Sequence, residues 1–196
     1  MSKENINTIP GEAELCALCV EAGASNAAAI PVAEIPFDPE LRKACEQNLC
    51  GAYGKNWTCP PACGDIHELI DRAKGYDRIL VFQTIGTLED SFDYEGMMAA
   101  SEKHAEVTKK VGELVCGRLK GDLLRLSAGG CRLCDTCAKA DDEPCRHPDE
   151  AISSLEAYGM FVSGLAGQCG MNYINGQNTV TYFGGVLYHE DALESV

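Results

Sequence analysis

Eight of the twelve cysteines in this 196-residue chain fall into two compact groups, and clustered thiolates are ligands for soft metals. The group nearer the C-terminus starts as C-x2-C-x2-C and gains a fourth cysteine after seven further residues. Its members are Cys131, Cys134, Cys137 and Cys145. The group nearer the N-terminus has the spacing C-x4-C-x8-C-x3-C. Its members are Cys45, Cys50, Cys59 and Cys63. Each group therefore offers four thiolates to one metal centre.

The spacing of the second group favours an iron–sulfur cluster over zinc. Three cysteines with the spacing C-x2-C-x2-C are typical of the bacterial ferredoxin motif, where they bind one iron–sulfur cluster. Structural zinc sites usually set two C-x2-C pairs well apart in the sequence, because each pair fills two corners of a tetrahedron. The first group matches neither pattern, so its four cysteines indicate metal more firmly than they indicate a [4Fe-4S] cluster. Zinc stays the alternative for both groups.

The rest of the composition agrees with a reducing compartment. The N-terminus has no basic stretch followed by an apolar run, so we expect no secretory signal. No run of eighteen apolar residues occurs, so we expect no membrane span. Dense cysteine in a cytoplasmic chain indicates metal binding more often than disulfides. We therefore expect a cytoplasmic metalloprotein.

The charge limits the classes of partner. The formal net charge is −14 with the thiols counted as neutral. Two cubanes on eight thiolates would bring it to about −18. Nucleic acid and anionic membranes both need a basic face, so we expect neither as a partner. A redox partner protein with a basic face is compatible with this charge, and so is a homodimer.

The elements that must position the second group form a strand–helix–strand pattern. Residues 78–85 are a compact apolar run that predicts a buried strand. Residues 94–120 show helical periodicity, and residues 122–127 predict a second strand that leads into Cys131. A strand, a long helix and a strand normally form a crossover with parallel strands, and ligands collect beyond the carboxyl ends of such strands.

Other elements complete an α/β (or α+β) fold with a small mixed sheet, flanking helices and two cysteine-rich loops. Asp65 is expected to cap a helix that ends at Gly75, which leaves Cys63 just before a helix N-terminus, where thiolate is favoured. The remaining expected elements are an edge strand over residues 29–37, a helical turn at 39–43, helices from 148 to 159 and from 163 to 169, and a strand over 178–188.

The N-terminal part is harder to interpret. Residues 1–15 are polar and are expected to be loosely held, and they precede Cys16 and Cys19 in a C-x2-C pair. Such a pair is a redox dithiol, half of a metal site, or two idle thiols. We expect residues 1–28 to form an N-terminal segment and residues 29–196 to form one metal-binding domain. Cys116 and Cys169 are expected to be structural thiols.

Several motifs resemble those of a known family in the same order along the chain. They are YGKNWTCPP at residues 53–61, CRLCDTC and PCRHP around the second group, SLEAYG at 154–159 and NTVTYFG near the end. They resemble an uncharacterised prokaryotic family of predicted metal-binding proteins, a domain of unknown function common in anaerobes. The resemblance covers roughly residues 30 to 190. It implies metal binding by both cysteine groups, implies no reaction, and leaves Cys16 and Cys19 outside the matched part.

These observations support one leading function and two alternatives. The leading hypothesis is an iron–sulfur protein with two [4Fe-4S] clusters that passes single electrons to or from a partner. Lys55, Arg132, Arg146 and His147 lie beside ligands in the sequence and could donate hydrogen bonds to cluster sulfur. One alternative is a redox enzyme acting on a small molecule through an open iron site or the N-terminal dithiol. The other is a structural zinc module.

Overall fold

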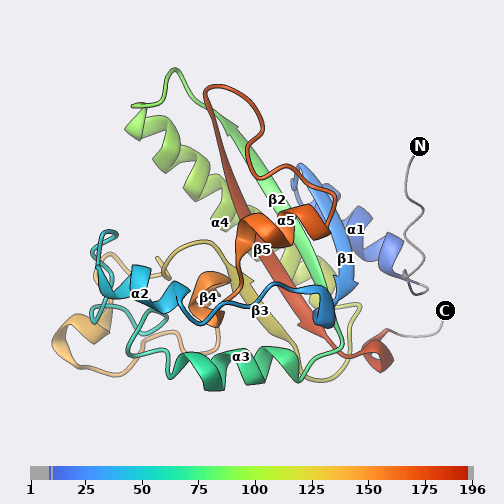
Figure 1. Ribbon diagram of the computed structural model, residues 1–196, viewed down its shortest axis with the longest axis horizontal. Helices are drawn as coiled ribbons and strands as arrows, with labels where there is room; N and C mark the ends of the chain where they lie inside the picture. Colours follow the sequence, from blue (N-terminus) through green and yellow to red (C-terminus); the bar gives the residue numbers. More distant parts are fainter. Residues whose placement is uncertain (1–8, 10, 194–196) are drawn as a thin grey trace.

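The fold is a mixed five-stranded sheet covered by helices on both faces, as a computed structural model shows (Figure 1). The structure describes residue 9 and residues 11–193. The strands are β1 (Asn26–Pro31), β2 (Arg78–Thr87), β3 (Leu124–Ser127), β4 (Ser153–Ser154) and β5 (Thr179–Tyr188). Their order across the sheet is β1-β2-β5-β3-β4, antiparallel except for the last pair. The expected α/β class with a small mixed sheet is confirmed.

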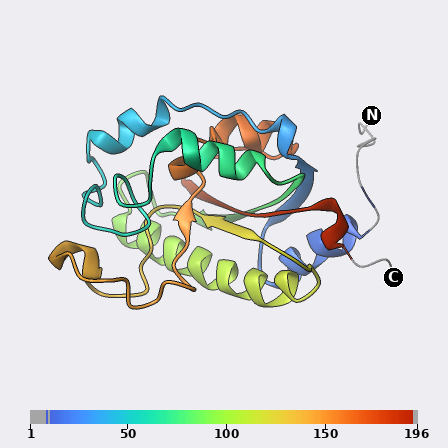
Figure 2. The ribbon, with the colours of Figure 1, turned by 90° about the horizontal axis from the view of Figure 1, so that it is seen from below.

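Two layers of helices enclose the sheet (Figure 2). The α-helices of the described residues are α1 (Glu12–Glu21), α2 (Leu41–Glu46), α3 (Ile66–Lys74), α4 (Tyr94–Cys116) and α5 (Val162–Gln168). Short 3-10 turns are η1 (Val32–Glu34), η2 (Ala138–Asp141), η3 (Glu156–Tyr158) and η4 (Glu190–Ala192). Helices α1 and α4 cover one face, and α3 and α5 cover the other. None of the helices in the described part of the chain is long and apolar enough to span a membrane.

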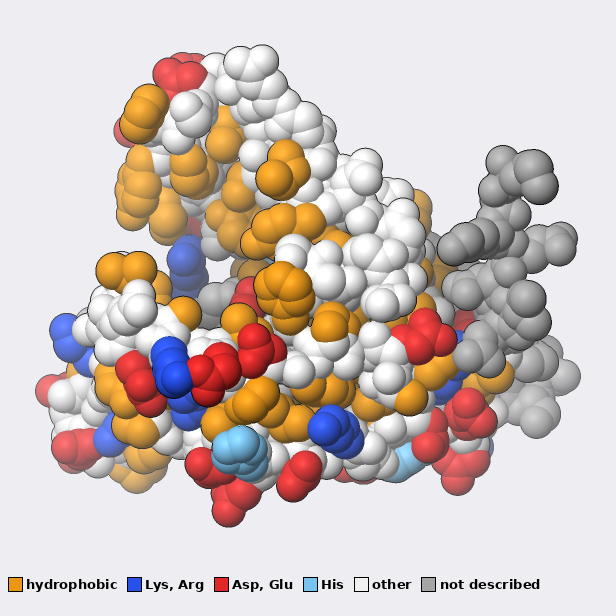
Figure 3. Space-filling model, in the orientation of Figure 1, with side chains coloured by type: hydrophobic (Ala, Val, Ile, Leu, Met, Phe, Trp, Pro, Cys, Tyr) orange, Lys and Arg blue, Asp and Glu red, His pale blue; other side chains and the backbone are white. Residues whose placement is uncertain are grey.

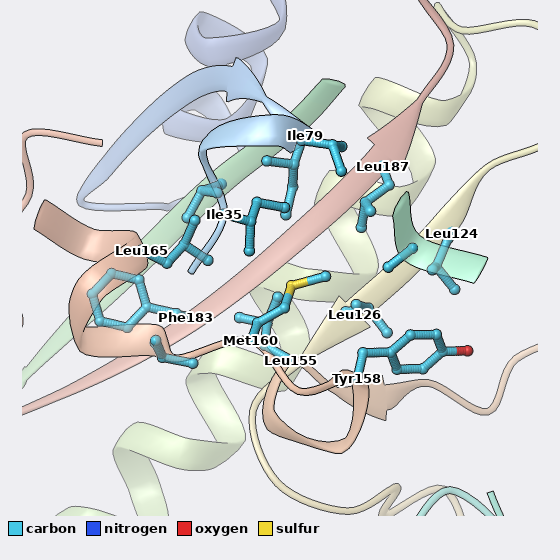
Figure 4. Packing of buried hydrophobic residues seen from close by; sticks show 14 of the residues in the cluster. Ile35, Ile79, Leu124, Leu126, Leu155, Tyr158, Met160, Leu165, Phe183 and Leu187 are labelled. Carbon is cyan, nitrogen blue, oxygen red and sulfur yellow. The ribbon is translucent and has the colours of Figure 1, made fainter. Parts of the chain in front are cut away.

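Side chains along β2 point alternately to the two faces of the sheet, so the core has two halves. Ile79 and Val81 point to the α3 and α5 side, while Leu80 and Phe82 point to the α1 and α4 side. Strand β2 is buried on both faces, which explains why its sequence is a continuous apolar run rather than an alternating one. Figure 4 shows the first half, where Ile79 and other labelled residues of β3 and β5 pack together.

The predicted crossover is present with one change. Strands β2 and β3 are both antiparallel to β5, so they run in the same direction, as expected. Strand β5, from the end of the chain, lies between them. The helix joining them, α4, ends at Cys116 rather than at Lys120. Cys131 follows the carboxyl end of β3, where a ligand site was expected.

Two local expectations are wrong. The predicted helix over residues 148–159 is a turn followed by β4 and η3, because Ser153 pairs with Leu126 at the edge of the sheet. Residues 12–15 are not loosely held, since they form the first turn of α1. By contrast, the expected cap of α3 is present: the Asp65 carboxylate accepts the backbone N–H groups of His67 and Glu68.

Helix α1 is fixed to the sheet by a buried ion pair. Glu12 is 0 % exposed and Arg78 is 2 % exposed. The Arg78 Nε donates to Glu12 Oε1 at 2.7 Å, and its Nη2 donates to Glu12 Oε2 at 2.8 Å. The Tyr188 hydroxyl also donates to Glu12 Oε1, at 2.7 Å. The start of α1 is therefore tied to both central strands.

The buried His104 on α4 makes stability depend on pH. Burial lowers the pKa of His104 to about 4, and its Nδ1 lies 2.9 Å from the Thr84 hydroxyl. Because the folded pKa is below the ordinary value of 6.5, the stability from the neutral ring is complete above pH 6.5 and is lost as pH falls toward 4. At pH 5 the loss is about 2 kcal/mol.

Urea unfolding of the wild type and of His104→Gln at pH 7.5 and pH 5 checks this. The wild type should lose about 2 kcal/mol more between the two pH values than the variant does. Equal losses in the two proteins would show that His104 does not carry this pH dependence.

Candidate metal centre

The second cysteine group lies in the long loop between β3 and β4. All four of its cysteines line one small pocket, together with Arg146 and other residues of the loops. That pocket offers about 20 Å³ of free space, enough for about one water molecule. The four cysteines of this group therefore border one pocket.

The first group is built by α2 and the loop that follows it. Helix α2 carries Cys45, and the loop brings Cys50, Cys59 and Cys63 back to the start of α3. Burial raises the pKa of Cys59 to about 11, and the nearby thiols of Cys50, Cys63 and Cys45 raise that pKa further. The four cysteines are therefore close enough to interact electrostatically.

The two cysteine loops are hydrogen-bonded to one another. The Asn56 side-chain amide donates to the Cys131 carbonyl at 2.8 Å, and the Cys131 N–H donates to Thr58 Oγ1 at 2.9 Å. Asn56 and Thr58 are buried and Cys131 is half-buried, and Asn56 Oδ1 also accepts from the Thr58 backbone N–H. Trp57 adds a bond from its indole N–H to the Glu143 carbonyl, at 2.9 Å. The motif NWT between Gly54 and Cys59 thus fixes the position of the second group.

The two groups are also neighbours in space. A Cβ atom built on Gly130 would lie 2.9 Å from Cys59 Sγ, so only glycine leaves room for this sulfur. One surface hollow of about 660 Å³ is bordered by Cys63 of the first group and Cys145 of the second. The fold therefore places two sets of four thiols side by side.

The thiols need a metal to become thiolates. Burial raises the pKa of Cys45, Cys63 and Cys131, and for Cys131 the backbone N–H groups of Leu133 and Ile152 partly oppose the rise. The expectation that the helix N-terminus favours thiolate at Cys63 is wrong for the free thiol, because burial raises its pKa. Metal binding displaces such protons, so these groups are suited to hold metal rather than to act as free nucleophiles.

Arg42 is a functional residue that the sequence analysis missed. Its guanidinium lowers the pKa of Cys45 and of Cys63, against the larger effect of burial. The Nη1 and Nη2 groups donate to the carbonyls of Gly64 and Ala157, at 2.9 and 3.3 Å. The buried Nε makes no hydrogen bond with any described residue. A metal-bound thiolate or sulfide would accept that N–H, so the first group fits an anionic metal–thiolate centre.

Four residues near predicted ligands in the sequence were expected to donate hydrogen bonds to cluster sulfur, and only two of them line the pocket of the second group. Arg146 and His147 line the pocket of the second group, but Arg146 donates to the Thr136 carbonyl and His147 lies 3.5 Å from the Glu150 carboxylate. Arg132 lines a different and larger pocket. Lys55 is exposed.

Among the described residues, no three His, Cys, Asp or Glu side chains are arranged so that they could hold one metal ion.

The remaining cysteines lie away from both groups. Cys19 is 0 % exposed in the core beneath α1, and burial raises its pKa to about 12. Burial raises the pKa of Cys16 to about 11 and that of Cys169 to about 12. Cys116 and Cys169 are half-buried and pack against the core, as expected for structural thiols. Thiols with such pKa values carry little thiolate at neutral pH, which argues against a reactive N-terminal dithiol.

Comparison with known proteins gives one match. No curated protein sequence and no solved structure is significantly similar to the chain. The model of a family described as predicted metal-binding protein (DUF2284) matches residues 28–188. Both cysteine groups lie inside the matched residues, and Cys16 and Cys19 lie outside them. The chain thus belongs to the DUF2284 family of predicted metal-binding proteins.

Proposed function

We propose that this chain is an iron–sulfur protein that holds two [4Fe-4S] clusters and transfers single electrons to or from a partner protein. The first cluster is assigned to Cys45, Cys50, Cys59 and Cys63. The second is assigned to Cys131, Cys134, Cys137 and Cys145. Such clusters supply one-electron redox chemistry when bound. Cytoplasmic location and a partner with a basic face complete the proposal, because the chain is strongly acidic.

The observation that carries this proposal is the bonding between the two cysteine loops. Asn56 and Thr58 from the first loop hold the backbone of Cys131 in the second. The Cys59 sulfur lies so close to Gly130, the residue before Cys131, that a Cβ atom there would be 2.9 Å from it. Two separate structural metal sites need no such contact, whereas two redox centres in one electron path must be adjacent. The chain's own residues thus fix the spacing between two thiol sets.

Reductive titration tests the proposal. Anaerobically purified protein, titrated with dithionite and followed by electron paramagnetic resonance, should take up about two electrons per chain. The spectrum of the doubly reduced protein should show magnetic coupling, because the two cysteine groups are neighbours. Protein that takes up no electrons would contradict the proposal.

A structural zinc module is the second candidate. The enclosed space among the second-group cysteines is about 20 Å³, which would hold a single ion without any opening of the loop. Zinc bound by four cysteines is tetrahedral and inert to reduction. This candidate predicts a colourless protein that dithionite does not change.

Arg42 should raise the reduction potential of the cluster in the first group. The Arg42 guanidinium, which lowers the pKa of both Cys45 and Cys63, also stabilises the more negative, reduced state of a cluster bound there. In Arg42→Leu the potential of one cluster should fall by about 50 mV, which corresponds to roughly 1.2 kcal/mol for one electron. Protein-film voltammetry measures this, and Lys43→Leu, which alters an exposed cation on the same helix, is the matched control. A fall of equal size in both variants would show a general charge effect.

A further inference from the structure

A further pocket lies beside the second cysteine loop. It measures about 520 Å³ and is formed by one side of α4 and by the segment that leads from β3 into the second cysteine group. The space-filling view shows the surface hollowed between the start of α4 and the cysteine loops, with a Lys or Arg side chain inside the hollow (Figure 3). Pockets of 300 to 1,000 Å³ are the usual size of small-molecule sites.

Small residues on two facing walls create this space. Ala105, Thr108 and Gly112 recur at helical spacing on α4, and Ser127 and Gly130 lie on the opposite wall. The walls are joined at one point, where the Thr108 hydroxyl lies 3.2 Å from the Ser127 hydroxyl and also donates to the His104 carbonyl. The pocket is therefore part of the packing of α4 on β3.

The pocket reaches the candidate metal centre. Cys131, assigned above as a ligand of the second group, is part of its wall. The adjoining Gly130 contacts the sulfur of Cys59, from the first group. A molecule bound in this pocket would lie next to the place where the two cysteine groups meet.

The charges around the pocket favour an anionic ligand at the cysteine end. On α4, Lys109 stands three residues after Glu106 and four before Glu113, so this wall of the pocket keeps one net negative charge. Glu150 faces His147 at 3.5 Å. The guanidinium of Arg132 makes no hydrogen bond or ion pair within the described part of the chain, and it adjoins Cys131. At the cysteine end the lining therefore carries two cations, Arg132 and Arg125, against one carboxylate, Glu150.

Arg125 adds a second, more rigid cation. Its Nη2 donates to the Asp149 carbonyl at 3.2 Å, and its Nη1 would lie 2.9 Å from a Cβ atom built on Gly112. Glycine at position 112 therefore lets this guanidinium lie across α4 at the pocket wall. Its position is set by the protein and does not depend on a ligand.

We propose that this pocket binds a small organic carboxylate, with the apolar part against α4 and the carboxylate toward Arg132 and Arg125, beside the second cysteine group. The proposal goes beyond electron transfer to a protein partner. It depends on the pocket and its two guanidinium groups, and it does not depend on which metal the cysteines hold.

Isothermal titration calorimetry with 2-naphthoate and its neutral counterpart 2-naphthamide tests this on the anaerobically purified full chain. The carboxylate should bind about tenfold more tightly than the amide, or about 1.4 kcal/mol. Arg132→Gln should remove this preference, whereas Lys110→Gln, at an exposed cation of α4 outside the pocket, should keep it. An unchanged preference in Arg132→Gln would overturn the assigned orientation.

Blocking variants test the location. Ala105→Trp fills the pocket from an exposed position on α4, and Ala99→Trp places the same side chain at an exposed position of that helix outside the pocket. Ala105→Trp should weaken the binding of both compounds at least about tenfold, and Ala99→Trp should leave their affinities unchanged. Ala128→Leu on the opposite wall should also weaken the binding of both compounds.

Two outcomes would overturn the proposal: no binding of either compound at millimolar concentration, or equal binding by Ala105→Trp and Ala99→Trp. Metal content, measured on every variant, should equal that of the wild type. Calorimetry reports binding whichever metal is present. A negative result for ligand binding in the pocket is therefore distinguishable from a negative result for the iron–sulfur proposal.

Discussion

Replacing Cys134 by alanine should remove about four of the expected eight irons per chain and leave the other cluster in place. Cys134 lines one pocket together with the other three cysteines of the second group. The loop that carries it has little regular structure apart from η2, so a cluster bound there would organise it. The variant should also unfold at lower temperature than the wild type. Iron analysis and circular dichroism measure the two effects.

A matched set of variants makes this result specific. Cys50→Ala should remove the other half of the iron, because Cys50 belongs to the first group. Changing Cys16 and Cys19 together to serine should leave the iron content intact, since both thiols lie on α1, away from the two groups. Unchanged iron in Cys134→Ala would refute the assignment of the second group. Lost iron in the Cys16 and Cys19 double variant would bring the N-terminal pair into a metal site.

Replacing Glu12 by alanine should destabilise the fold by about 3–5 kcal/mol, because it takes the counter-charge from a buried arginine. Glu12 is 0 % exposed and accepts two hydrogen bonds from Arg78 and one from Tyr188. Tyr188→Phe removes only one hydrogen bond to the carboxylate and should cost about 1.5–3 kcal/mol. Urea unfolding of the anaerobic protein gives both values.

The control for this prediction is on the same helix. Glu14 pairs with Arg118 at 2.7 Å, the same distance as the buried pair, but the two side chains are 48 % and 59 % exposed. Glu14→Ala should therefore cost at most about 1 kcal/mol. Comparable losses in Glu12→Ala and Glu14→Ala would show that the buried pair does not anchor α1.

The elements with strong local patterns could be predicted from the sequence. The apolar run of β2, the alternating run of β5 and the capping aspartate of α3 are signals contained within about ten residues. Helix α1 gave no such signal. Glu12 looks like a solvated acid in a polar segment, and its burial depends on Arg78, which lies 66 residues away in the sequence.

Tertiary pairing explains the wrong helix over residues 148–159. Pro148 and the acids after it begin a turn in which the backbone N–H groups of Glu150 and Ala151 bond to the His147 carbonyl. Beyond the turn, Ser153 pairs with β3, and Leu155 is buried in the core. Pairing with a strand thus replaced a local helical preference.

For the site, spacing divided eight cysteines into two groups along the chain, but it could not show how the two loops that carry them meet. The bonds from Asn56 and Thr58 to Cys131 span more than seventy residues of sequence. One local signal was available: Arg42 precedes Cys45 by three residues on α2, so both lie on one side of that helix. That spacing places the guanidinium on the same side of α2 as the Cys45 thiol, whose pKa it lowers.

Iron, acid-labile sulfide and zinc per chain, measured on protein purified without oxygen, test the central claim most directly. The two-cluster proposal predicts about eight irons and eight sulfides, with broad visible absorption that dithionite bleaches. About two zinc ions, no sulfide and a colourless protein would contradict it, and would make both cysteine loops structural.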